Sequence, residues 1–231
     1  MQNDAVETGE KVRGISIRVL VVLGVSAIFL FVLFFLANNI VLKNQTDFDI
    51  SVFQLLGRFR SHTATKVLTF FTFFGSINFL LPAYLLLSLY FIFFKKNNLR
   101  SFNIASIGLS SGLLLYLVKN IFQRHRPPNP LIANVTGFSF PSGHSFSFFT
   151  FIGVLIYLLW ESKAHIALKL CATIVLFFLA TTIAFSRVYL QVHYASDVIA
   201  GFCLSFVWLA ICIFILRRIN KEGTFFKNPV G

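Results

Sequence analysis

A histidine, a carboxylate and an arginine lie close together in the segment Ser186 to Asp197, which reads Ser-Arg-Val-Tyr-Leu-Gln-Val-His-Tyr-Ala-Ser-Asp. His193 and Asp197 are one helical turn apart, so a helix over these residues would place both side chains on one face, where the carboxylate can orient the imidazole. Arg187 adds a cation just upstream. A histidine ordered by a carboxylate beside an arginine predicts nucleophilic attack on an anionic substrate.

A second polar cluster, Pro141-Ser142-Gly143-His144, stands where a polar loop gives way to an apolar run. Ser142 is a favourable residue to precede a helix, and the free N–H groups that follow it would form a seat for an anion. Gly143 has no side chain to obstruct a phosphate. His144 would lie beside that seat, where an imidazolium can protonate a leaving oxygen. The alternative is a capping turn with an incidental histidine.

A third cluster begins with Lys119, at the end of an apolar run, and continues to Arg126. A cation inside a membrane span is costly and usually faces a cavity or a partner, which makes Lys119 a candidate site residue. The alternative for Lys119 is a side chain that extends to the lipid headgroups. Arg124 and His125 form a basic triplet with Arg126; they contact a second phosphate or headgroup, or they form a solvated loop face.

The composition identifies a membrane protein. Of 231 residues, 57% are hydrophobic and 31 are phenylalanine, which is too apolar for a soluble domain of this size. The formal net charge is +12, and basic residues beside membrane spans usually meet anionic lipid headgroups and set the topology. No basic groove with interleaved aromatic residues lies outside the apolar runs, so membrane lipids are the expected partners and nucleic acid is not. The sequence assigns no oligomeric state.

Six apolar runs are long enough to cross a membrane as helices. They are expected at Val19 to Ala37, Thr63 to Phe94, Phe102 to Asn120, Gly143 to Trp160, Ile166 to Phe185 and Ala195 to Leu216. The second run exceeds one crossing, so its first turns should lie outside the membrane, with a kink at Pro82. We expect an all-α polytopic protein, a six-transmembrane-helix bundle that forms a single domain over residues 1–231.

The segment Phe48 to Arg60 has the pattern of an amphipathic helix lying in the membrane interface. Its apolar face is expected to consist of Phe48, Val52, Leu55 and Phe59, and its polar side of Asp49, Gln54 and Arg58. The alternative is a plain connector. Because the loops leave little room for a separate specificity domain, this helix is a candidate gate for lateral access of a lipid.

An even number of crossings places both termini on one side of the membrane, and the basic residues select that side. Most of the 20 Lys and Arg residues fall in the termini and in the turns on the same side as the termini, which the positive-inside rule assigns to the cytoplasm. We therefore expect residues 1–18 and 217–231 to be cytoplasmic. The three polar clusters should then face the outside of the cell membrane.

Carboxylates are scarce in this chain. It has 8 Asp and Glu residues, none of them between Asp49 and Glu161. A two-metal phosphatase needs several converging carboxylate or histidine ligands. We therefore predict chemistry without a metal or other cofactor.

Together, Lys119-x6-Arg126-Pro127, Pro141-Ser142-Gly143-His144 and Ser186-Arg187-x5-His193-x3-Asp197 resemble the three-part signature of the type 2 phosphatidic acid phosphatase superfamily, which comprises membrane lipid phosphate phosphatases. The resemblance covers about a third of the chain. It implies that His193 is a nucleophile that forms a phosphohistidine, that Asp197 orients it, and that His144 protonates the departing alcohol. The phosphate-binding set that it implies is Lys119, Arg126, Ser142, Gly143 and Arg187. Cations and amide donors in these positions would stabilise the oxygens of a transferring phosphoryl group.

The resemblance implies a lipid monophosphate or diphosphate as substrate. Phosphatidylglycerophosphate, phosphatidic acid, undecaprenyl diphosphate and lipid A phosphates all fit, and we favour a broad or phosphatidylglycerophosphate-type specificity. The alternative function is a non-catalytic lipid-phosphate binder or anion transporter that uses the same basic pocket. A binder or transporter would not need His144, His193 or Asp197. A haloperoxidase activity is disfavoured because six spans place the site at a lipid interface.

Overall fold

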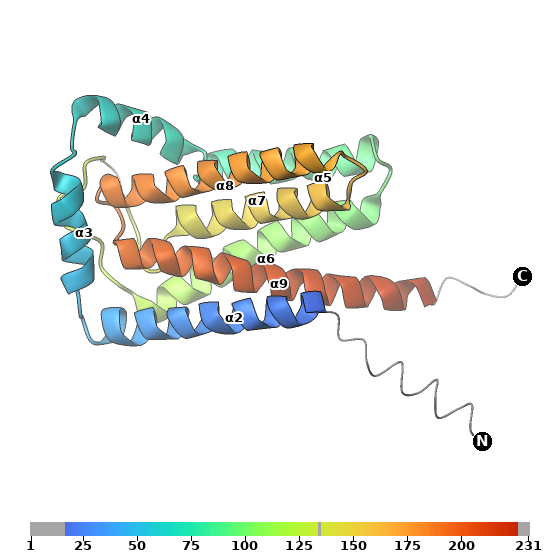
Figure 1. Cartoon of the computed structure of the whole chain (residues 1–231), viewed down its shortest axis with the longest axis horizontal. Helices are drawn as coiled ribbons and strands as arrows, with labels where there is room; N and C mark the ends of the chain where they lie inside the picture. The colour runs from blue at the N-terminus through green and yellow to red at the C-terminus, as the bar shows by residue number, and fades with distance from the viewer. Residues whose placement is uncertain (1–16, 134, 226–231) are drawn as a thin grey trace, which may run out of the picture.

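The computed structural model describes residues 17–133 and 135–225, and the regular elements within these ranges are all helices (Figure 1). They are α2 (Ile17–Phe35), the π-helix η1 (Leu36–Leu42), α3 (Asp47–Gly57), α4 (His62–Phe73), α5 (Ile77–Phe93), α6 (Asn98–Phe122), α7 (Gly143–Glu161), α8 (Ile166–Tyr189) and α9 (Ala195–Phe225). Six helical stretches are long and apolar enough to cross a membrane. The expected all-α, six-span membrane fold is therefore confirmed. Most of the predicted N-terminal segment and the end of the C-terminal tail lie outside the described residues.

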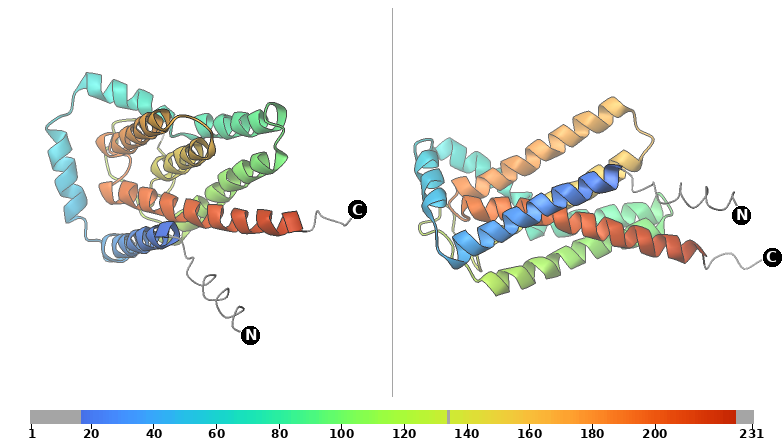
Figure 2. Two further views of the ribbon diagram at one scale, coloured as in Figure 1. Left: turned by 45° about the vertical axis from the view of Figure 1, so that its right-hand side comes forward. Right: turned by 60° about the horizontal axis from the view of Figure 1, so that its bottom comes forward.

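Helix α7 is the centre of the bundle. It packs against α8 and α9, and also against α5 and α6, and it is the most buried of the six spans. Figure 2 shows α7 enclosed by these neighbours. Its phenylalanines Phe148, Phe149 and Phe151 form a core with Ile183 and Ala184 of α8. Burial of such large apolar side chains holds α7 in a defined position.

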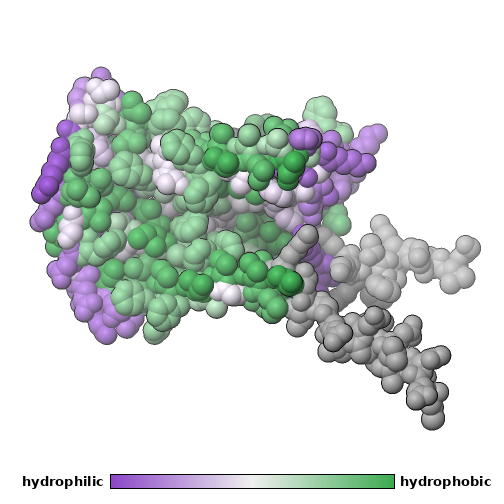
Figure 3. Space-filling view, viewed as in Figure 1, coloured by the Kyte–Doolittle hydropathy of each residue, from purple (hydrophilic) through white to green (hydrophobic). Residues whose placement is uncertain are grey.

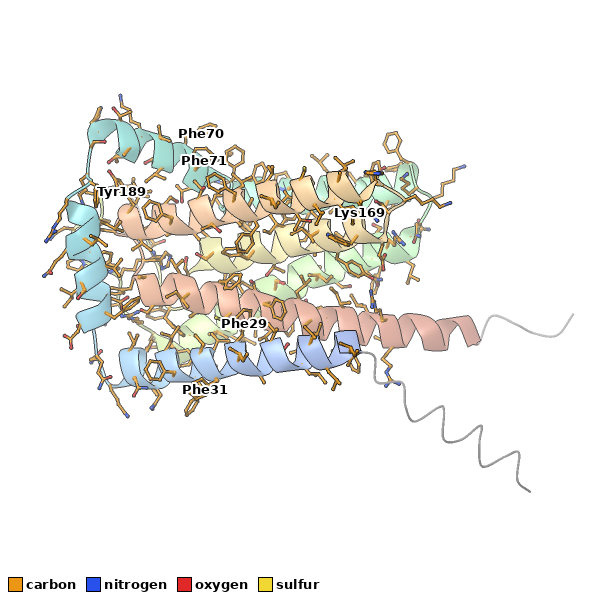
Figure 4. All side chains as sticks on the ribbon, viewed as in Figure 1. Phe29, Phe31, Phe70, Phe71, Lys169 and Tyr189 are labelled. Atoms are coloured by element: carbon orange, nitrogen blue, oxygen red, sulfur yellow. The ribbon has the colours of Figure 1, made fainter. Side chains whose placement is uncertain are left out.

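The surface of the bundle carries an apolar band between two polar ends (Figure 3). Large apolar side chains such as Leu86, Leu109 and Phe178 are exposed along the spans, as expected of surfaces that face lipid. Figure 4 shows Tyr189 at the α3 end of the bundle and Lys169 at the opposite end, although both belong to α8. The described ends of the chain, at α2 and α9, lie together at the end opposite α3 (Figure 1).

The segment predicted as one helix kinked at Pro82 consists of two helices, α4 and α5. They meet at Phe74, Gly75 and Ser76, whose N–H groups donate to carbonyls three residues earlier, at 3.0–3.2 Å. Pro82 lies inside α5 without ending it. A Cβ on Gly75 would lie 2.8 Å from Ile183 Cγ2 and 3.0 Å from His144 Cδ2, so only glycine fits this junction against α7 and α8.

Helix α3 forms where the interfacial helix was expected, but the prediction is wrong about Asp49, which faces inward beside Val52, while Gln54 and Arg58 are exposed as expected of the polar side. Asp49, predicted to be on the polar side, is 0% exposed, and the half-buried Val52, Phe53 and Leu56 share its face. The predicted apolar residues Phe48, Leu55 and Phe59 are exposed. The reason is that Asp49 has charged and polar partners beneath α3, and outward apolar side chains are favourable at a membrane surface.

Helix α9 approaches the first turn of α7 closely. A Cβ on Gly201 would lie 2.9 Å from the carbonyl oxygen of Ser142 and 3.1 Å from the backbone nitrogen of Phe146. At the same contact, the Ser142 N–H donates to the carbonyl of Asp197 at 2.9 Å. The first and second polar clusters, Ser186–Asp197 and Pro141–His144, are thus joined through their backbones.

Candidate active site

The three polar clusters meet at the α3 end of the bundle. Helices α6 and α8 end there and helices α7 and α9 begin there (Figure 1). Adjacent antiparallel spans bring the end of one and the start of the next to the same depth. The loop between α6 and α7 folds over this end, where the Leu131 N–H donates to the Leu190 carbonyl at 2.9 Å.

His193 is buried in the connection between α8 and α9, with 1% of its surface exposed. Its backbone N–H donates to the Arg187 carbonyl at 3.2 Å, which folds the connection back onto the end of α8. Its Nδ1 lies 3.5 Å from Asp197 Oδ2 and 3.3 Å from Ser139 Oγ. The structure therefore brings together the histidine and carboxylate that their spacing predicted to be neighbours.

The contacts of the His193 ring determine its tautomer. Nη1 of Arg126 lies 3.1 Å from Nε2, and a guanidinium can only donate, so Nε2 must carry the lone pair. Nδ1 then carries the proton and faces the Asp197 carboxylate. This is the tautomer in which Nε2 can act as a nucleophile.

Burial determines the charge of His193. Desolvation lowers its pKa to about 3, although the hydrogen bond and charge of Asp197 oppose this shift; Arg126 and Arg187 lower the pKa further. The imidazole is therefore neutral over the physiological pH range, as a nucleophile must be.

Arg126 is fixed by backbone carbonyls of the loop and of the α8–α9 connection. It donates from Nε to Gly137 O at 2.9 Å, from Nη2 to Thr136 O at 2.9 Å and from Nη1 to Val192 O at 2.7 Å. Burial lowers its pKa, and Asp197 opposes this; an arginine nevertheless keeps its charge. The result is a rigid cation in contact with the His193 ring.

Arg187, in the last turn of α8, is a second buried cation. It is 4% exposed, and its Nη1 donates to Thr72 Oγ1 of α4 at 2.7 Å. Its Nε is buried without a hydrogen-bond partner among the described residues. A buried donor without a partner is unfavourable, so Arg187 is poised to bind an anion.

The remaining predicted residues lie at the junction of α6 and α7. A Cβ on Gly143 would lie 3.7 Å from Lys119 Cε, and Lys119 Nζ donates to Phe138 O at 2.6 Å. His144 follows Gly143 in the first turn of α7 and lies against the junction of α4 and α5 at Gly75. Among the described residues, no hydrogen bond involves the His144 ring, so its nitrogens are available for proton transfer.

Ser142 occupies the position before α7, as expected, but its hydroxyl does not cap the helix. It accepts from Ser145 Oγ at 3.0 Å. The backbone N–H groups at the start of α7 are thus not used by the Ser142 side chain.

Sequence reasoning missed two polar residues of the site. Ser139 is 0% exposed and donates a hydrogen bond to Asp197 Oδ2. Thr72 binds Arg187 from α4. Neither serine nor threonine stands out in a loop or an apolar helix, so the sequence contains no signal for either residue.

Arg124 and Asp49 form a buried ion-pair network with Asp197. Arg124 lies 2.6 Å from Asp197 Oδ1 and 2.8 Å from Asp49 Oδ2, with 9% of its side chain exposed. It is therefore not part of a solvated loop face, whereas its neighbour His125 is exposed. Burial alone would lower the Arg124 pKa, but Asp197 and Asp49 raise it above its ordinary value. The signal for Asp49 was present in its helical spacing from Val52, Phe53 and Leu56.

No group of three or more His, Cys, Asp or Glu residues within the described ranges is arranged to hold a metal ion. His62 and His165 are exposed. His165 accepts from the Ala167 N–H at 3.3 Å and caps α8 far from the site.

Residues 101–221 match the model of the PAP2 superfamily, a range that includes all three clusters. Phosphatidylglycerophosphatase B of Bacillus subtilis (strain 168) is 29% identical over 164 residues, covering 71% of this chain and 78% of that protein. Dolichyldiphosphatase 1 of Dictyostelium discoideum is 31% identical over 128 residues, covering 50% of this chain and 56% of that protein. The relatives are therefore phosphatases by name.

Two crystal structures are similar in fold. The transmembrane PAP2-type phosphatidylglycerolphosphate phosphatase from Bacillus subtilis has a TM-score of 0.73 at 24% identity, covering 85% of this chain and 96% of that one. Aquifex aeolicus LpxE has a TM-score of 0.54 at 23% identity, covering 71% of this chain and 94% of that one. At these identities the likeness concerns the arrangement of the helices.

Proposed function

This chain belongs to the PAP2 superfamily, and on that premise we propose that it is an integral membrane lipid phosphate phosphatase that acts through a phosphohistidine on His193. One observation carries the proposal. The buried His193 has Asp197 at Nδ1 and a guanidinium at Nε2, 3.1 Å away. This arrangement supports a neutral imidazole with its lone pair directed at a cationic pocket, which is where a phosphoryl group would bind.

We propose that the phosphate displaces the contact between Arg126 and Nε2. One phosphoryl oxygen takes over the Nη1 donor, which frees the lone pair for attack. Arg187, with its unpartnered Nε, and Lys119 bind the other oxygens, together with the N–H groups at Gly143. These donors stabilise the negative charge of the transition state without reorganisation.

In the first step Nε2 of His193 bonds to phosphorus while the bond from phosphorus to the leaving oxygen breaks. His144 gives its proton to that oxygen, and the lipid alcohol departs, or a lipid monophosphate if the substrate is a diphosphate. In the second step water attacks the phosphohistidine and gives its proton to His144. Inorganic phosphate leaves and His193 is restored.

The proposed substrates are membrane lipid phosphates. The names of the two relatives support phosphatidylglycerophosphate and a polyprenyl diphosphate as the first compounds to test; phosphatidic acid belongs in the same panel. The proposed site lies at the polar end of the apolar band, within reach of a headgroup.

The test is release of inorganic phosphate from this panel by the purified protein in detergent. We expect turnover by the wild type, no measurable turnover by His193→Ala, and inhibition by vanadate, which mimics the five-coordinate transition state. His165→Ala, at an exposed histidine far from the site, is the control and should keep wild-type turnover. Binding of lipid phosphate by both wild type and His193→Ala without any release would instead identify a binder or transporter.

We further propose that the reaction needs no metal ion, because the cations of the site come from the side chains of Lys119, Arg126 and Arg187. Turnover should be unchanged in excess chelator. Loss of activity that Mg²⁺ restores would contradict this part of the proposal and leave the phosphatase assignment intact.

A further inference from the structure

Helix α3 is connected to the candidate active site by a buried carboxylate. Asp49 accepts hydrogen bonds from the Ser196 N–H at 2.9 Å, from Ser196 Oγ at 2.7 Å and from Arg124 Nη2 at 2.8 Å. The Ser196 N–H belongs to the first turn of α9 and has no acceptor within that helix. Asp49, 147 residues earlier in the chain, therefore caps the start of α9. The Asp49 carboxylate thus connects α3 to the first turn of α9 and to the loop that follows α6.

Arg124 continues this connection to Asp197. Its Nη1 donates to Asp197 Oδ1 at 2.6 Å and to Ser196 Oγ at 2.8 Å, while Nη2 binds Asp49. The guanidinium also lies 4.0 Å from the centre of the Tyr194 ring, and Phe53 of α3 packs against the same ring. A planar guanidinium held along one side and on one face has a single orientation.

The two oxygens of Asp197 have different partners. Oδ2 faces His193 Nδ1 and accepts from Ser139 Oγ and from the Tyr194 N–H at 3.0 Å. Oδ1 is bound by Arg124. The rotation of the carboxylate about its axis, which determines whether Oδ2 faces the histidine, therefore depends on Arg124.

We propose that Asp49 and Arg124 are positioning residues for the phosphatase reaction: Asp49 orients Arg124, and Arg124 orients the Asp197 carboxylate toward His193. Neither residue needs to contact the phosphate. The inference rests on the proposed function and makes α3 part of the catalytic structure as well as a helix at the membrane surface.

The test is steady-state kinetics of phosphate release by Asp49→Asn, with Asp47→Asn as the matched control. Asp47 is an exposed acid in the first turn of the same helix. Asparagine keeps the size of Asp49 and, through Oδ1, the acceptor for the Ser196 N–H, while its NH2 group replaces the oxygen that Arg124 Nη2 and Ser196 Oγ bind. Thermal unfolding of each variant checks that it is folded at the assay temperature. We expect kcat to fall about tenfold with KM within about twofold, because a misplaced catalytic group lowers turnover more than binding. Asp47→Asn should leave both unchanged.

A second pair of variants tests whether Asp49 acts through Arg124. Arg124→Gln should lower kcat at least as much as Asp49→Asn, while His125→Ala, at the exposed neighbour, should not. The double variant Asp49→Asn/Arg124→Gln should be no less active than Arg124→Gln, because the connection through Arg124 is already lost and the second change removes the buried carboxylate that Arg124→Gln leaves without its charged partner.

Wild-type kcat in Asp49→Asn would overturn the proposal, and so would effects of the two single variants that multiply in the double variant. Failure of the wild type to release phosphate would overturn the proposed function itself. An active wild type, an inactive His193→Ala and an unaffected Asp49→Asn would refute the positioning role alone.

Discussion

At the scale of single residues, the main feature of this protein is a histidine kept neutral by burial and kept in one tautomer by its neighbours. Asp197 lies at Nδ1 and Arg126 at Nε2, so the ring cannot exchange its donor and acceptor nitrogens. The neutral form is the one that the fold prefers, since the pKa of His193 is lowered to about 3. Reactivity and acid sensitivity therefore have the same physical origin.

The lowered pKa of His193 predicts how the stability of the folded protein depends on pH. The unfolded His193 titrates near 6.5 and the folded one near 3, so below pH 6.5 the unfolded chain binds a proton that the folded chain does not. Stability is unaffected above pH 6.5 and falls as the pH decreases from there toward 3. At about pH 5 the loss should be about 2 kcal/mol.

Thermal unfolding in detergent at neutral and acidic pH, for the wild type and His193→Gln, checks this prediction. The variant should lose less stability on acidification, since glutamine does not titrate. His125→Gln, at an exposed position, should behave like the wild type. Equal acid sensitivity of the wild type and His193→Gln would show that His193 has no such linkage.

At the scale of the elements, the position of the site depends on where helices begin and end. The break between α4 and α5 brings Thr72 to Arg187, and the inward orientation of Asp49 on α3 brings it to Arg124. The close approach of α9 to α7 joins Ser142 to Asp197. Each of these contacts links residues that are distant in the chain.

We predict that Gly201→Ala destabilises the protein by about 1–3 kcal/mol, because its Cβ would overlap the backbone of α7 and force the two helices apart. Turnover should fall as well, since the same contact aligns Ser142 with Asp197. Thermal unfolding and phosphate release measure the two effects. Gly112→Ala, in α6 with nothing within 4 Å of its Cβ, is the control and should be neutral or stabilising. Equal behaviour of the two variants would contradict the prediction.

At the scale of the whole molecule, an even number of spans brings the start of α2 and the end of α9 to one end of the bundle. The candidate site lies at the other end (Figure 1). The end of the bundle where the chain termini lie carries Lys95 and Lys96 after α5, Lys163 after α7 and Lys169 at the start of α8. By the positive-inside rule, we predict that this end is cytoplasmic and that the site faces outward.

Labelling of single cysteines with a membrane-impermeant maleimide tests this orientation. In a background with Cys171, Cys203 and Cys212 replaced by Ser, Asn129→Cys in the loop between α6 and α7 should react on intact cells. Lys163→Cys, in the turn between α7 and α8, should react only after lysis. The reverse pattern would place the site on the cytoplasmic side.

The sequence by itself determined the membrane class, the approximate spans and the three clusters, because each depends on local composition or on spacing within a few helical turns. The four-residue spacing of His193 and Asp197 also predicted that they are neighbours, although α9 begins only at Ala195 and the connection that folds back onto Arg187 is what places the His193 ring. Only the tertiary structure decided that Asp49 of α3 faces inward, that Arg124 bridges two carboxylates and that α4 ends at Phe73. Helical spacing places Asp49 on one face with Val52, Phe53 and Leu56, but the partners that hold this face inward, Arg124 and Ser196, lie 75 and 147 positions further along the chain.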